Sequence, residues 1–187
     1  MQVLTLPARQ GWRWLLDGFR IFRKFQFMFP VIVLGYWMLM VILNSVPMIG
    51  PVVATVCIPV FSVSLMNVCR VIEQGGRINP SLLLSGFREN LRTLLILGVI
   101  YLGVALGILG LTSMIDDGML LNFFVIGRGS NEARTGSENV MLSAQIALVF
   151  FIPLMMAYWY APVLAAWHGM SAAKSLFFSF VACLRNW

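Results

Sequence analysis

The sequence contains 187 residues, of which 60% are hydrophobic and 11% are charged, and its formal net charge at pH 7 is +6. Soluble domains contain about 45–50% apolar and about 25% charged residues, so this composition excludes an ordinary soluble domain. In lipid, every backbone polar group must be hydrogen-bonded within the chain, which permits only helices or a closed barrel. The hydrophobic segments are long and lack the alternation of barrel strands. We therefore expect an all-α integral membrane protein that forms a single membrane domain over residues 1–187.

Residues 8–28 are predicted to form an interfacial amphipathic helix. Charged residues occupy positions 9, 13, 17, 20 and 24, at steps of three and four, and Trp12, Leu15, Phe19 and Phe22 have similar spacing on the opposite face. A helix with basic residues on one side and Trp, Phe and Leu on the other lies in the plane of the lipid headgroups. The basic residues of this segment are Arg9, Arg13, Arg20, Arg23 and Lys24.

Four transmembrane helices are predicted, at residues 30–46, 52–69, 93–115 and 142–162. The first two form a hairpin over 30–69, and the last two form a second hairpin over 93–162. A polar connector at 70–92 separates the hairpins and contains a second amphipathic segment. Residues 171–187 look like the start of a third amphipathic helix. The basic residues of the connector are Arg70, Arg77, Arg88 and Arg92.

The distribution of positive charge predicts the orientation of these helices. Of the 13 lysines and arginines, 11 lie before the first span, in the connector or after the last span, and 2 lie between the third and fourth spans. Short loops rich in Lys and Arg stay in the cytoplasm. We therefore expect a multi-pass protein of the bacterial inner membrane with its N-terminus, its connector and its C-terminus in the cytoplasm.

Two sets of matching residues indicate an internal repeat. The motif Leu-Leu-x-Gly-Phe-Arg occurs at 15–20 and again at 83–88, and a shift of 94 residues aligns Pro59 with Pro153 and Gly75 with Gly169. The repeating unit is an amphipathic helix followed by a hairpin. Because residues 171–187 would begin a third unit, the chain either ends unusually or is a piece truncated from a six-span protein, and we favour the second interpretation.

The chain resembles a family of uncharacterised polytopic inner-membrane proteins of Gram-negative bacteria in the segments "LPARQGWRWLLDGFRIFRK", "SVPMIGP" and "YAPVLAAWHGMSAAKSLFFSF". More distantly, it is similar to the membrane domains attached to some glycerophosphoryl diester phosphodiesterases. The resemblance covers the whole chain and implies further spans beyond this C-terminus. It transfers no activity and no catalytic residues.

The residues give no support to an enzyme or to an ion-coupled pump. No charged residue falls inside the four predicted spans, where proton relays and ion pathways normally place them. His168 is the only histidine, and the paired carboxylates Asp116 and Asp117 are expected on the opposite side of the membrane from it. Hydrolysis of phosphodiesters needs several carboxylates, usually with histidines, around a metal ion. We therefore expect no catalytic residues, no metal and no cofactor.

Three prolines are candidate helix kinks. Pro59 and Pro153 lie within the second and fourth predicted spans, and Pro162 ends the fourth. A proline inside a helix removes a hydrogen bond and bends the axis. In transporters, matched interruptions in two halves mark the substrate site. Prolines in other membrane helices only shape packing, and we favour that interpretation here.

Gly103, Gly107 and Gly110 share one face of the third predicted span. Small residues there allow another helix to approach closely, either from within the chain or from another protein. The basic residues attract anionic lipid headgroups by about 1 kcal/mol per charge, although the predicted topology requires them in any case. Because the membrane accounts for the net charge, we expect no nucleic-acid partner.

Two functions remain open. The leading hypothesis is a non-enzymatic accessory or scaffold subunit that acts through helix packing and contact with anionic membrane lipids, with another membrane protein or a second copy as its partner. The alternative is a transporter or lipid-handling protein for an uncharged or apolar substrate. A polar-lined cavity near Pro59 and Pro153 would favour the alternative, and a tightly packed bundle would count against it.

Overall fold

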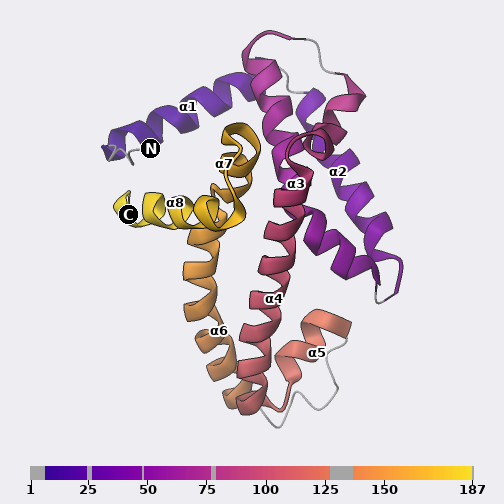
Figure 1. Cartoon of the computed structure of the whole chain (residues 1–187), viewed down its shortest axis with the longest axis vertical. Coiled ribbons are helices and arrows are strands. Elements are labelled where there is room, and N and C mark those ends of the chain that lie inside the picture. Colours follow the sequence, from indigo (N-terminus) through magenta and orange to yellow (C-terminus); the bar gives the residue numbers. More distant parts are fainter. Residues whose placement is uncertain (1–6, 25–26, 48, 77–78, 127–136, 187) are drawn as a thin grey trace.

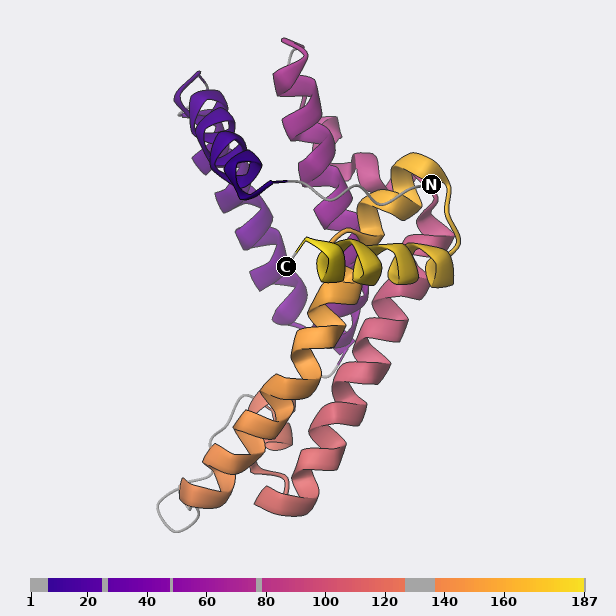
Figure 2. The ribbon, with the colours of Figure 1, turned by 90° about the vertical axis from the view of Figure 1, so that its left-hand side faces the viewer.

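The computed structural model describes residues 7–24, 27–47, 49–76, 79–126 and 137–186, and the regular secondary structure in these ranges is helical throughout. Figures 1 and 2 show the helices from two directions. In chain order they are α1 (Ala8–Lys24), α2 (Met28–Asn44), α3 (Ile49–Glu73), the 3-10 helix η1 (Pro80–Arg88), α4 (Leu91–Asp116), α5 (Met119–Ile126), α6 (Ser137–Tyr158), α7 (Ala161–His168) and α8 (Ala172–Arg185).

Three segments are long and apolar enough to cross a membrane, namely Ile49–Glu73, Leu91–Asp116 and Asn139–His168, the last of which combines α6 with α7. At about 1.5 Å per residue, the 25 residues of α3 extend about 38 Å, more than the ~30 Å hydrocarbon core of a bilayer. The predicted first span is shorter, because α2 has 17 residues and extends only about 26 Å. Three of the four predicted spans are therefore long and apolar enough to cross a membrane.

The turn between α2 and α3 is tight. Asn44 ends α2, and its side-chain Nδ2 donates a hydrogen bond to the carbonyl of Met40 (2.8 Å). Gly50, in the first turn of α3, lies against the carbonyl of Leu43, where a Cβ would collide. Glycine at this position therefore lets α3 start directly beside the end of α2.

The core lies where α3, α4 and α7 meet. Val60 of α3, Leu94 and Leu97 of α4, and Ala161 and Ala165 of α7 are fully buried and form one cluster. The two alanines allow α7 to lie close to its neighbours, because small side chains need little space between helices. This cluster fixes the direction that the chain takes after α6.

α4 and α6 run side by side in both views, with α5 at the end of the pair that is far from α8 (Figures 1 and 2). Ile108 of α4 packs with Ala147 and Leu154 of α6. At the end of α4, the Asp116 carboxylate accepts hydrogen bonds from the backbone N–H groups of Gly118 (3.2 Å) and Leu120 (2.9 Å). This carboxylate therefore caps the turn into α5.

α1 and α8 both lie across the direction of α4 and α6 (Figure 1). α8 crosses the end of α6 and buries Ser175 and Ser179 against it and its neighbours. α1 extends away from the other helices, and its Trp12 and Leu15 are 66% and 67% exposed. Only its C-terminal part approaches the protein, where Ile21 packs on a small cluster formed by α2 and α3. Trp12 and Leu15 of the predicted apolar face are thus exposed rather than packed against the bundle.

The predicted second amphipathic segment contains the short 3-10 helix η1. η1 has nine residues and packs closely on α3. The Gly86 N–H donates to Ser64 Oγ (2.9 Å), and a Cβ on Gly86 would collide with the carbonyl of Val60. This close approach buries the centre of η1 against α3, so η1 is held against the bundle.

The two glycines that the proposed repeat aligns share one backbone conformation. Gly75 has φ of 72° and Gly169 has φ of 61°, a region that favours glycine because it has no Cβ. Gly75 follows α3 and precedes η1, whereas Gly169 follows α7 and precedes α8. In both places the chain leaves a long apolar segment and turns into a shorter helix.

Candidate functional site

The chain changes direction between α6 and α7, and α8 supplies hydrogen bonds at this break. In a continuous helix the Tyr160 N–H would donate to the carbonyl of Met156, four residues earlier. Here the Tyr160 N–H donates to Ser179 Oγ (2.9 Å), and Ser179 donates to the Met156 carbonyl (2.9 Å). A fully buried hydroxyl from α8 is therefore inserted between two backbone groups of the break.

Pro162 begins α7 and does not end the fourth span, which corrects the sequence-based prediction. The break falls at residues 159–160, and Pro162 occupies the first turn of α7. Proline is well tolerated there because its missing N–H would have no partner within the helix. Pro59 and Pro153 lie inside α3 and α6. Pro59 and Pro162 both line a cavity beside the break.

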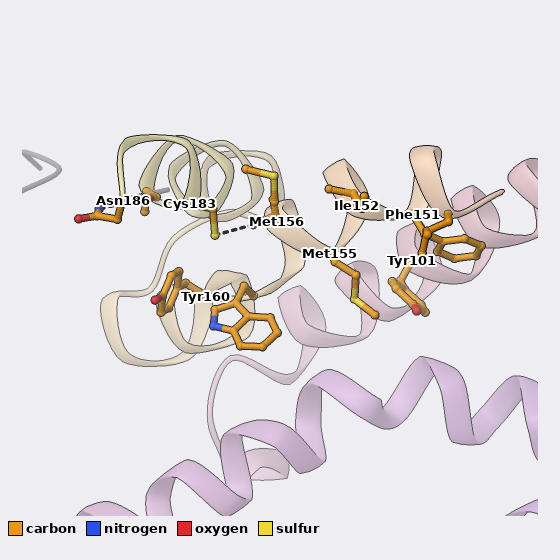
Figure 3. Close-up of a pocket in the computed structure, with 11 residues that line it drawn as sticks. Tyr101, Phe151, Ile152, Met155, Met156, Tyr160, Cys183 and Asn186 are labelled. Carbon is orange, nitrogen blue, oxygen red and sulfur yellow. Dashed lines mark hydrogen bonds between the residues drawn. The ribbon is translucent and has the colours of Figure 1, made fainter. Parts of the chain in front are cut away.

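Two apolar cavities flank the break. The first has a volume of about 650 Å³ and lies between α6 and α8, with Tyr101 of α4 at one end (Figure 3). The second has a volume of about 510 Å³ and lies between α3 and the α6–α7 segment. Tyr101, Met155, Trp159 and Tyr160 line both cavities, which therefore adjoin each other. Because ligand pockets usually measure about 300–1,000 Å³, each cavity can hold a small molecule or part of a lipid chain.

Several polar groups around these cavities are already hydrogen-bonded to the protein. The Tyr158 hydroxyl donates to the carbonyl of Leu97 (2.7 Å), and the Cys183 thiol donates to the carbonyl of Met156 (3.4 Å, the dashed line in Figure 3). Burial raises the pKa of the Cys183 thiol, which keeps it protonated at neutral pH. The cavities therefore offer mainly apolar surface and differ from the polar-lined cavity expected of a transporter or lipid-handling protein.

A third cavity, of about 560 Å³, adjoins the second and contains charged groups. Met66 lines both cavities and so marks the boundary between them. Beyond it, the third cavity is lined by Arg70 and Glu73 of α3 and by His168 of α7. The Arg70 guanidinium lies over the ring of Trp167, 5.1 Å from its centroid, which is within the range of a cation–π interaction.

The buried side chain of Asn67 fixes the position of Trp167. Asn67 Oδ1 accepts a hydrogen bond from Trp167 Nε1 (2.9 Å), and its Nδ2 donates to Ser85 Oγ (3.1 Å) and to Glu89 Oε1 (3.2 Å). One amide thus connects α3 to η1, to the residue after η1 and to α7. This contact could not be predicted from local sequence patterns, because Asn67 and Trp167 are 100 residues apart.

The predicted glycine face has no close neighbour among the described residues. A Cβ added to Gly103, Gly107 or Gly110 would meet nothing within 4 Å. At Gly98 of the same helix, a Cβ would collide with the backbone of Val56 in α3. The glycine that allows close packing of α4 is therefore Gly98, which sequence analysis missed.

Seven of the nine predicted basic residues are described with their side chains, and all seven are exposed. Arg20 is paired with Asp17 across one turn of α1 (2.9 Å). Lys24 is the last residue of α1, and Arg77 lies outside the described residues. The side chains that are exposed are those of Arg9, Arg13, Arg20, Arg23, Arg70, Arg88 and Arg92. The structure therefore leaves these cations accessible to lipid headgroups.

A helical chain with three apolar segments of membrane-spanning length is a membrane protein. The chain is 32% identical over 193 residues to a curated protein of Burkholderia thailandensis that is named as a probable inner membrane protein, and the alignment covers 100% of this chain and 71% of that protein. The chain belongs to this family of inner membrane proteins, as the resemblance predicted. No family model matches it, and no solved structure does. These comparisons give no support to the more distant link with glycerophosphoryl diester phosphodiesterases.

Proposed function

We propose that this chain is a non-enzymatic lipid-handling protein of the inner membrane, which binds hydrocarbon chains in the two adjoining apolar cavities. The observation that carries the proposal is the wall that Tyr101, Met155, Trp159 and Tyr160 share between cavities of about 650 and 510 Å³. A bundle that is packed tightly throughout would leave no such space. The apolar lining suits a lipid chain better than a polar solute.

Shape and headgroup contacts, rather than hydrophobicity, must provide the selectivity. A lipid chain gains little hydrophobic energy when it moves from the bilayer into the protein, because the bilayer interior is as apolar as the cavity. Binding therefore depends on a preformed space and on polar groups near the end of the chain. The change of direction at residues 159–160 supplies that space, because it leaves room on both sides of the α6–α7 segment.

A substitution that fills the first cavity tests the proposal. Ala182 of α8 lines this cavity, whereas Ala173 of the same helix is exposed and does not line it. We expect Ala182→Phe to co-purify with several-fold less lipid than the wild type in mild detergent, and Ala173→Phe to match the wild type. Bound lipid is extracted and measured by mass spectrometry, and unfolding temperatures are compared to ensure that both variants are folded. Equal lipid content in all three proteins, or no lipid in any, would contradict the proposal.

A second candidate function is that of an accessory or scaffold subunit. It is favoured by the open face of α4 at Gly103, Gly107 and Gly110, where another chain can approach the backbone closely. We expect Gly107→Leu to reduce the size of any complex extracted in mild detergent. Val104→Leu, at an exposed position outside this face, is the matched control. An unchanged complex size in Gly107→Leu would exclude an association through these glycines.

We also propose that α2 crosses the membrane as the first of four spans and that both termini face the cytoplasm. The distribution of basic residues supports this orientation. A periplasm-dependent reporter enzyme inserted between residues 127 and 136 is expected to be active, and the same reporter attached to the C-terminus is expected to be inactive. The reverse pattern would mean that the orientation is inverted.

A further inference from the structure

The third cavity combines opposite charges that are not paired with each other. Arg70 and Glu73 are one turn apart on α3, a spacing at which an acid and a base commonly form an ion pair. The structure places no Glu73 oxygen within 4.0 Å of the Arg70 guanidinium, although both residues line the same cavity. Each charge is therefore available to a ligand.

The position of Arg70 is set by a neighbour other than Glu73. Its guanidinium lies over Trp167, 5.1 Å from the ring centroid, and Trp167 is held by its hydrogen bond to Asn67 (2.9 Å). A cation–π contact uses no hydrogen bond from the guanidinium, so its N–H groups can donate to a ligand. His168 follows Trp167 and lines both this cavity and an adjoining one that contains Lys174. The cationic side of the site therefore has a defined geometry, with further positive charge nearby.

The charged cavity is continuous with the apolar cavity next to it. Met66 lines both, and α7 passes from the apolar cavity at Pro162 to the charged one at His168. At about 1.5 Å per residue, these two positions are about 9 Å apart along the helix. An elongated molecule with a polar end and an apolar end can therefore occupy both cavities together.

We propose that this pair of cavities binds a glycerophospholipid whose headgroup carries a phosphate and a primary ammonium group, that is, a lipid of the phosphatidylethanolamine class. The phosphate contacts Arg70, the ammonium contacts Glu73, and one acyl chain enters the cavity lined by Pro59 and Pro162. The inference rests on the proposed function and adds the class of lipid to it.

Charge complementarity favours this headgroup over the two obvious alternatives. A purely anionic headgroup satisfies Arg70 but brings a second negative charge close to Glu73 and offers that carboxylate no cationic partner. A choline headgroup has both charges, but its trimethylammonium group has no N–H to donate to Glu73. Hydrogen bonds between two charged groups are shorter and stronger than neutral ones, so the primary amine gains the most from this site.

Lipid competition tests the inference on the full chain. Delipidated protein in mild detergent is given an equimolar mixture of phosphatidylethanolamine, phosphatidylcholine and phosphatidylglycerol with identical acyl chains, and bound lipids are counted by native mass spectrometry. We expect the wild type to bind phosphatidylethanolamine about tenfold better than either competitor, the factor that corresponds to one additional charged hydrogen bond. Glu73→Gln should abolish the preference over phosphatidylcholine, and Arg70→Gln should weaken binding of all three lipids.

Arg88→Gln, an exposed arginine that does not line the cavity, is the matched control and should keep the wild-type preference. Should Arg70→Gln fail to fold, Glu73→Gln alone decides the question. Binding of lipid without a headgroup preference, a preference for phosphatidylglycerol, or a preference that survives Glu73→Gln would overturn the inference and leave lipid handling intact. A protein chain retained in place of lipid, or no retained lipid at all, would overturn the proposed function together with the inference.

Discussion

Replacement of Ser179 by alanine tests the structure of the break between α6 and α7. The serine is fully buried, accepts a hydrogen bond from the Tyr160 N–H and donates one to the Met156 carbonyl, both at 2.9 Å. Alanine removes both bonds without adding bulk. The Cys183 thiol also donates to the Met156 carbonyl, at 3.4 Å, and so keeps that group partly satisfied. The Tyr160 N–H is then the group left without a partner.

The size of the effect follows from the two lost hydrogen bonds. Each contributes about 1 kcal/mol, so we expect the free energy of unfolding to fall by about 2 kcal/mol. Ser175→Ala is the matched control, because Ser175 is also fully buried on α8 but donates only to the carbonyl of Ala172 in its own helix (2.9 Å). Its loss leaves no N–H unpaired and should cost about 0.5–1 kcal/mol.

Denaturant unfolding in detergent, followed by circular dichroism, measures both variants under the same conditions. We expect Ser179→Ala to unfold at a clearly lower denaturant concentration than Ser175→Ala. If the two variants unfold together, or if Ser175→Ala is the less stable, the Ser179 hydroxyl does not stabilise the break between α6 and α7, and the reasoning is refuted.

Two further predictions concern α4 and α8. Gly98→Ala should greatly reduce the yield of folded protein, because its Cβ collides with the backbone of α3. Gly107→Ala has open space for its Cβ and should raise the free energy of unfolding by about 0.5–1 kcal/mol, because alanine loses less conformational freedom than glycine in a helix. Equal midpoints of thermal unfolding for the two variants would contradict this. In a Cys57→Ala, Cys69→Ala background, alkylation of Cys183 by iodoacetamide should have its midpoint above pH 9.0, the ordinary thiol pKa, because burial raises the pKa of this thiol. Stability should correspondingly decrease as the pH rises above 9.0, since the unfolded chain then releases the thiol proton more readily, and a midpoint at or below 9.0 would exclude the effect of burial.

The helices could be predicted from the sequence because each depends on residues that are close together in the chain. The spacing of charged and aromatic residues predicts α1, and continuous apolar runs predict α3, α4 and α6. The break at residues 159–160 could not be predicted in this way. The hydroxyl that hydrogen-bonds to both sides of the break belongs to Ser179. This residue is 19 residues from Tyr160 and 23 from Met156, and it lies on another helix.

The glycines of α4 show, within one helix, that sequence patterns do not predict tertiary contacts. Gly98 and Gly107 are identical residues on the same apolar helix, yet one lies against the backbone of Val56 and the other faces open space. A periodic pattern shows which residues share a face of a helix, but it does not show what that face contacts. The candidate site is missed for the same reason, because the cavities arise between α3, α4, α6, α7 and α8 rather than within any of them.

α1 depends on its surroundings rather than on the fold for its helical structure. Its Trp12 and Leu15 are 66% and 67% exposed, so the rest of the protein provides little apolar surface to hold them. An isolated helix of 17 residues is only marginally stable in water, because nucleation is costly. We propose that the boundary between lipid and water supplies the free energy that keeps α1 helical. The secondary structure of this chain would then depend on the bilayer as well as on the protein, and α1 would unfold when the membrane is removed.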